Sequence, residues 1–166
     1  IAFATYSQLQ CGADLATVDG LIERALALNP GSSVVRYNSG WIYVFACRSE
    51  AAFAECEMGL RLDPRSPWRL ALTLGQGFSL FHLRRFAEAI PLLYNGIVDV
   101  QRALTMRMIA SCYGHLGRHQ EARAVPGGLA PAAPPELRWL GLFRNRSFQA
   151  ILDEGLALAA GDAAST

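Results

Sequence analysis

Apolar residues recur along this chain at the three- and four-residue spacing of amphipathic helices. The first strong example starts after Asp14, a suitable N-cap, and continues to Leu28. The segment Asn29-Pro30-Gly31 ends it, because proline cannot continue a helix. Residues 1–10 carry a rougher stripe of the same kind. Residues 1–30 are therefore expected to form one helical hairpin.

Three further hairpins are expected from the same periodicity. In the second, Ser32 or Ser33 caps a helix ending near Ala46, and Ser49 caps a partner ending near Leu62. The second helix of the fourth hairpin should be short, because Pro126 interrupts it. The approximate boundaries of the four hairpins are 1–30, 31–64, 65–101 and 102–134.

Two more helices are expected to close the stack over residues 136–160. The first is short and apolar and ends near Phe143, and Ser147 caps the second, which ends near Ala160. Terminal helices of this kind cover the exposed core of a last repeat. Residues 1–160 would then form a single domain, and residues 161–166 a disordered tail.

A repeated sequence supports this division into hairpins. Leu26-Ala27-Leu28-Asn29-Pro30-Gly31-Ser32 returns 34 residues later as Leu60-Arg61-Leu62-Asp63-Pro64-Arg65-Ser66, and such a period is typical of stacked helical hairpins. Two columns of small residues follow the same period, and both place a three-residue insertion between the second and third hairpins, near residues 65–69. The columns are Val18, Ala52, Ala89 and Ala122, and Ala25, Gly59 and Gly96.

The composition fits a folded domain and argues against several kinds of partner. Hydrophobic residues make up 52% of the 166 residues and charged residues 17%. A net charge of +1 gives no electrostatic reason to expect nucleic acid or an anionic membrane as the main partner. No apolar run reaches the length of a membrane span, about 20 residues. The chain starts at Ile1 within an amphipathic pattern, so we expect it to be part of a longer protein.

The cysteines and the other candidate chemical groups predict no reaction. The four cysteines form no zinc-binding spacing, so we expect free thiols in a cytoplasmic protein, with a Cys47–Cys56 disulfide as the alternative. Gly75-Gln76-Gly77 lacks the third glycine of a nucleotide loop and falls within a helical pattern. His115 and His119 are separated by a turn at Gly117 and should not share a helix face. No catalytic residue, metal site or cofactor is therefore expected.

The repeated segments resemble the tetratricopeptide repeat (TPR) region at the C-terminus of some bacterial class III adenylate/guanylate cyclase-like proteins and winged-helix regulators. The resemblance covers about residues 25–156. Of the generic repeat pattern, Gly40, Tyr43, Ala52 and Pro64 match, whereas Arg36, Ser39 and Cys56 depart from it. The segments that carry the resemblance are Leu26–Pro30, Arg85–Ile90, Gly114–Arg118, Glu121–Arg123, Leu142–Phe148 and Leu152–Leu156.

The resemblance implies an all-α solenoid of about four TPR-like hairpins with terminal capping helices. It also implies a non-catalytic function, namely binding of a peptide or protein segment in the concave groove of a larger bacterial signalling protein. The first helix of each pair lines that groove. The residues expected to face it are Tyr37, Trp41, Phe45, Phe78, Phe81, His82, Arg107 and Ser111.

Other readings of the same residues stay open at this stage. The aromatic residues of the expected groove could instead be ordinary core, or could be covered by the protein's own terminal helix. The chain could also be a self-association module, or an intramolecular regulatory domain of a nucleotide cyclase. A groove that clamps a terminal carboxylate through lysine is not expected, because the chain has no lysine.

Overall fold

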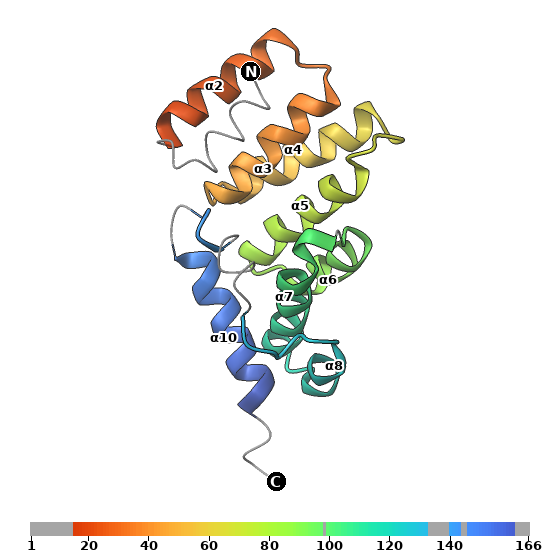
Figure 1. Cartoon of the computed structure of the whole chain (residues 1–166), viewed down its shortest axis with the longest axis vertical. Helices are drawn as coiled ribbons and strands as arrows, with labels where there is room; N and C mark the ends of the chain where they lie inside the picture. The colour runs from red at the N-terminus through yellow and green to blue at the C-terminus, as the bar shows by residue number, and fades with distance from the viewer. Residues whose placement is uncertain (1–14, 98, 133–139, 144–145, 162–166) are drawn as a thin grey trace.

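The computed structural model describes residues 15–97, 99–132, 140–143 and 146–161, and this part of the chain is helical without any strand (Figure 1). The all-α prediction is thus confirmed. The described helices are α2 (Leu15–Leu28), α3 (Ser33–Phe45), α4 (Ser49–Leu62), α5 (Arg69–His82), α6 (Phe86–Asn95), the 3-10 helix η1 (Asp99–Gln101), α7 (Arg102–His115), α8 (His119–Ala124) and α10 (Ser147–Gly161).

Helices from α2 to α8 pack in series, each against its neighbour in the chain. Their bounds locate the expected insertion, because α2 and α4 end 34 residues apart, at Leu28 and Leu62, whereas α3 and α5 end 37 residues apart, at Phe45 and His82. The connection between α4 and α5 has six residues, 63–68, against four, 29–32, between α2 and α3, and α5 is one residue longer than α3. Two of the three extra residues therefore lie in the connection and one in α5. The expected helix over residues 1–10, the Asp14 cap and most of the expected helix over 136–143 lie outside the described residues.

Both small-residue columns are buried, as the repeat predicts. The four members of the first column have no exposed surface.

Two other glycines, Gly40 on α3 and Gly75 on α5, approach the α4 residue Cys56. A Cβ atom built on Gly40 would lie 2.6 Å from the Cys56 sulfur, and one built on Gly75 would lie 2.7 Å from it. Helices α3 and α5 can therefore both pack closely on α4 only because these two positions lack side chains.

Three hairpin turns have the same backbone geometry. Between paired helices, Cys47, Arg84 and Gly117 each adopt a left-handed conformation, with φ of 58°, 58° and 69°. In each turn the next residue, an arginine, donates its amide to a carbonyl five residues back: Arg48 to Tyr43, Arg85 to Leu80 and Arg118 to Tyr113. This is the Schellman arrangement that ends many helices. The pairs α3–α4, α5–α6 and α7–α8 are therefore joined by the same kind of turn.

The first residue of α4 corrects one prediction. Ser49 does not cap α4, because the N-cap position is Arg48, which makes no side-chain capping bond. The Ser49 hydroxyl instead lies 2.7 Å from Nδ1 of His82 on α5. Ser147 is likewise the first residue of α10, which extends one residue beyond the expected end at Ala160. By contrast, Ser32 caps α3 as expected and accepts a hydrogen bond from the Val35 amide at 3.3 Å.

Helix α10 does not extend the stack in the way the earlier helices do. Helix α5 is the first helix of its pair, and it packs more on α4, the second helix of the pair before it, than on α3, the first helix of that pair. Helix α10 reverses this preference and lies mainly along α7, the first helix of the last pair, with smaller contacts to α8 and α5 (Figure 1). The C-terminal helix therefore crosses the side formed by the first helices, which we call the inner face (α3, α5 and α7).

Candidate functional site

Most of the residues expected to line a groove are buried under the protein's own C-terminal segment. Trp41, Phe45, Phe78 and Phe81 come from α3 and α5, and each is at most 1% exposed. His82, Arg107 and Ser111 follow them along α5 and α7. The side of the helices on which these residues were expected is therefore not an open surface in the structure.

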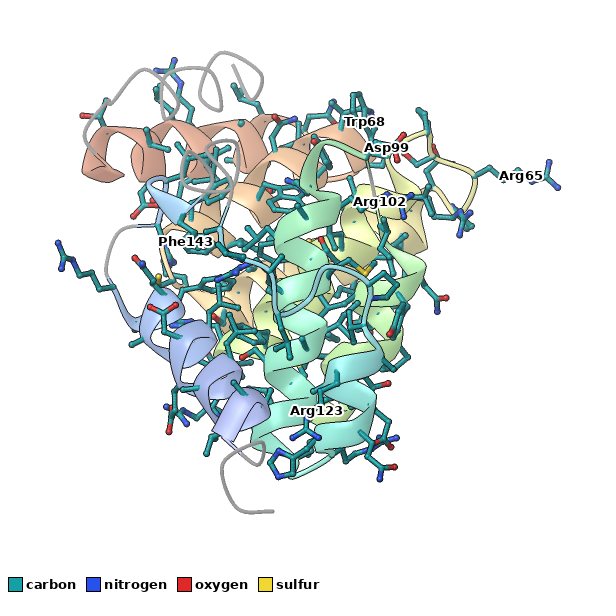
Figure 2. The ribbon with its side chains drawn as sticks, turned by 60° about the horizontal axis from the view of Figure 1, so that its bottom comes forward. Arg65, Trp68, Asp99, Arg102, Arg123 and Phe143 are labelled. Carbon is teal, nitrogen blue, oxygen red and sulfur yellow. The ribbon has the colours of Figure 1, made fainter. Side chains whose placement is uncertain are left out.

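Two phenylalanines of the C-terminal segment cover the aromatic residues. Phe143 and Phe148 stack on each other with ring centroids 4.0 Å apart. Phe143 contacts Phe45 edge-on at 5.4 Å and is drawn beside the start of α10 in Figure 2. Phe148 lies 5.6 Å from Phe78 and 5.1 Å from Phe81. These rings and Trp41 make one aromatic cluster that joins α3, α5 and α10.

His82 connects three helices through its two ring nitrogens. Its Nδ1 lies 2.7 Å from the Ser49 hydroxyl on α4, and its Nε2 lies 2.7 Å from the Ser147 hydroxyl at the start of α10. A neutral imidazole can donate to one hydroxyl and accept from the other. Burial lowers the pKa of His82, an effect that Glu50 partly opposes. The neutral form is therefore the one that suits this position.

Helix α7 holds the main chain of α10. The Ser111 hydroxyl donates to the Ile151 carbonyl at 3.3 Å, and Nε2 of His115 donates to the same carbonyl at 2.9 Å. The His115 ring is itself stacked on Phe86, with centroids 4.2 Å apart and planes within 1°. Arg107, one turn earlier, donates to the Ala130 carbonyl in the connection that follows α8. In each of these hydrogen bonds the acceptor is a backbone carbonyl, so the bond does not depend on the side chain of the accepting residue.

The backbones of α7 and α10 approach closely at a pair of glycines. A Cβ atom built on Gly155 would lie 2.5 Å from the Ser111 carbonyl oxygen and 2.6 Å from Cδ2 of His115. One built on Gly114 would lie 2.9 Å from the Ala159 amide nitrogen and would overlap the Gly155 carbonyl oxygen. No side chain fits at either position without moving the helices apart.

Tyr37 and Trp41 are the two α3 residues of the expected groove set that come first in the chain. Tyr37 on α3 stacks on Trp68, with centroids 4.7 Å apart and planes 22° from parallel, and both rings are half-buried. Trp41, one turn further along α3, lies 5.4 Å from Phe78 and belongs to the buried cluster. Of the eight expected residues, Phe45, Phe78, Phe81, His82 and Ser111 contact residues 140–161 directly.

Sequence reasoning missed the residues on the other side of these contacts. Phe143 and Phe148 were expected only as parts of terminal helices, and Ser49 and Ser147 only as caps. The signal that could have found them is the phenylalanine pair itself, since an exposed helix rarely needs two large aromatic side chains close together. Whether the inner face binds a partner stays a prediction.

Two described cysteines are buried thiols. Cys56 and Cys112 are in no disulfide, so the alternative of a Cys47–Cys56 disulfide is wrong. Burial raises the pKa of both Cys56 and Cys112 well above the usual range, which keeps them protonated. No group of three or more His, Cys, Asp or Glu residues in the described ranges could hold a metal ion. No helix in the described part of the chain combines the length and apolar composition needed to cross a bilayer.

Comparisons with protein-family models, with curated proteins and with solved structures return no significant match to this chain.

Proposed function

We propose that this chain is a non-catalytic protein-interaction module built from TPR-like hairpins, and that its inner face binds a peptide or protein segment in place of the C-terminal helix. The TPR-like arrangement is supported by the three identical turns at Cys47, Arg84 and Gly117 and by the buried columns of small residues. Helical repeats of this kind present a continuous inner surface to partners. The proposal includes no cofactor and no reaction.

One observation supports the proposal most directly: the inner face contacts the helix α10 through both its side chains and its main chain. The side chains of that segment enter an aromatic cluster, and its main chain accepts hydrogen bonds from Ser111 and His115. Buried aromatic anchors surrounded by directional polar contacts are the usual composition of a strong interaction site. A partner segment with similar chemistry could make the same contacts.

The same observation favours regulation within one polypeptide over self-association. The occupant of the inner face belongs to the same chain, so release of α10 would couple partner binding to a change at the C-terminus. In a longer signalling protein, such as one with a nucleotide cyclase domain, that change could be transmitted to the rest of the molecule. The expected cytoplasmic location and bacterial origin belong to this proposal.

A photo-crosslinking experiment tests the proposed function. The experiment uses the full chain carrying Gly155→Ala. A photoreactive phenylalanine analogue replaces either Leu158, on the exposed side of α10, or Phe81, which lies against Phe148 beneath α10. Binding at the inner face predicts that position 81 crosslinks one protein from the source cell and position 158 does not. Equal crosslinking from both positions, or none from position 81, would reject it.

A further inference from the structure

The side chains of α10 define the partner that the inner face can accept. We infer that the inner face selects an amphipathic helix from another protein, and that this helix carries a defined pattern of residues. The pattern starts with a phenylalanine, which is followed by aliphatic residues three and four positions later, a glycine seven positions later and a small residue eleven positions later. This inference rests on the proposed function and adds the identity of the bound segment. In α10 the pattern is Phe148, Ile151, Leu152, Gly155 and Ala159.

The phenylalanine is the anchor of the pattern. Phe148 is 1% exposed and lies against Phe78, Phe81 and the His82 ring, whose centroid is 6.2 Å away. An aromatic ring can satisfy these stacked and tilted contacts, whereas an aliphatic side chain leaves part of the space unfilled. Ser147 precedes it and places a hydroxyl on His82, so the site also recognises a polar group at the start of the helix.

The glycine determines where the helix can lie along α7. Only a residue without a side chain fits at position 155, because Ser111 and His115 occupy the space that a Cβ atom would need. Ile151 and Leu152 fill the apolar surface between this crossing and the phenylalanine anchor, and are 6% and 0% exposed. A helix shifted by one turn would bring a larger residue to the crossing. The glycine therefore sets the register, and the phenylalanine is the largest side chain that the helix buries.

The occupant must be a helix, because of how α7 binds it. Ser111 and His115 both donate to one carbonyl, that of Ile151, within the helix. The buried positions recur at the spacing of one helix face. Leu156 beside them is half-buried, and the other residues between them are exposed. An extended peptide would place alternate residues on opposite sides and could not present this set together.

Peptide titration into the full chain tests the inference. The probe is a fluorescent peptide with the sequence of residues 146–161, and the proteins are the full chain with Gly155→Ala and its control with Gly161→Ala. Both substitutions replace a glycine of α10 by alanine, but a Cβ atom at Gly161 meets no atom within 4 Å. The Gly155→Ala chain should bind the peptide at least tenfold more tightly, because its own helix competes less well.

The peptide variants test the pattern itself. A peptide with Gly155→Ala or Phe148→Ala should bind the Gly155→Ala chain at least tenfold more weakly than the unmodified peptide, and one with Gly161→Ala should bind equally well. Equal binding of all four peptides would overturn the inference. If the Gly155→Ala chain loses its helical circular dichroism, the same titrations are made with a Phe148→Ala chain, and the same outcomes apply.

A displayed library of random 16-residue peptides separates failure of the inference from failure of the proposed function. Selection of peptides that carry the pattern supports both. Selection of peptides that lack the pattern but compete with one another for the inner face would overturn the helix pattern, while the binding function stands. If neither the library nor the α10 peptide binds either chain, both proposals fail.

Discussion

Single small residues determine how closely the helices of this protein approach. Ala89, at the start of α6, has no exposed surface, whereas Ala87, two residues earlier on the same helix, is exposed. The two positions have the same residue type and similar helix context, but only one faces the packed side. They therefore form a natural comparison between packing and helix propensity.

We expect Ala89→Leu to lower the free energy of unfolding by about 1–3 kcal/mol through overpacking, and Ala87→Leu to change it by less than about 0.5 kcal/mol. Urea denaturation followed by circular dichroism measures both values. Equal effects of the two substitutions would show that the repeat register is misplaced.

The hairpin turns give a second prediction at the residue scale, because only one of the three left-handed positions is a glycine. Gly117→Ala should lower the free energy of unfolding by about 1 kcal/mol, since alanine disfavours a positive φ. The added Cβ atom meets nothing within 4 Å, so the cost is conformational. Cys47→Gly should act in the opposite direction, because glycine relieves the same conformation.

Thermal unfolding of both turn variants provides the measurement. The account requires a lower melting temperature for Gly117→Ala and a higher one for Cys47→Gly. A decrease in both would mean that the Cys47 side chain contributes more through its contacts than its conformation costs.

At the scale of elements, features set by neighbouring residues could be predicted from the sequence, whereas contacts between distant segments could not. The ends of α2 and α4 and the burial of Ala52 and Ala89 follow from periodicity and from the repeated Asn/Asp-Pro segments, which act on neighbouring residues. The role of Ser49 does not, because its hydroxyl contacts His82, 33 residues away. Contacts between distant segments leave no local pattern in the sequence, so capping rules alone assigned this serine wrongly.

The same distinction applies at the candidate site. The helical register predicts that Phe78, Phe81 and Ser111 lie on one side of α5 and α7. The sequence leaves open whether that side is a groove, ordinary core or a surface covered by the terminal helix, because the contact between Phe148 and Phe81 joins segments that are far apart in the chain. Reliable placement of α10 needs the tertiary structure.

The stability contributed by His82, which contacts Ser49 on α4 and Ser147 on α10, should depend on pH. Because burial holds the pKa of His82 below its usual value, the unfolded chain binds a proton more readily than the folded chain. The contribution of His82 to stability is therefore complete above about pH 6.5, the usual histidine value, and declines as the pH falls below it.

Urea denaturation at pH 7.5 and pH 5.5 measures this effect, with His82→Gln as the variant that keeps hydrogen-bonding groups but does not titrate. The wild-type chain should lose more stability than the variant over this range. Parallel losses in the two proteins would show that His82 does not contribute to the pH dependence. Glu88 and Glu121 titrate below this window, since their pKa values are lowered.

At the scale of the whole molecule, we expect helices α2 to α8 and the C-terminal helix to have different roles. Helices α2 to α8 pack in series, and α10 packs on them mainly through α7. Its buried residues Phe148, Ile151 and Leu152 belong to the same hydrophobic core as residues of α3, α5 and α7. Burial of Phe148, Ile151 and Leu152 contributes roughly 5–9 kcal/mol before the cost of ordering the segment. Much of this gain is offset by conformational entropy. Helix α10 should therefore open more readily than the rest of the molecule unfolds.

Native-state hydrogen exchange of the full chain tests this claim most directly, because it measures the opening free energy of each amide group. We predict that the amides of residues 151–159 in α10 exchange through an opening that costs less free energy than global unfolding, while amides of α4 and α5 exchange only through global unfolding. Gly155→Ala should lower the α10 value further and Gly161→Ala should not. If α10 exchanges with the same free energy and the same denaturant dependence as α4 and α5, the helix is a permanent part of the core, and the inner face is not available to a partner.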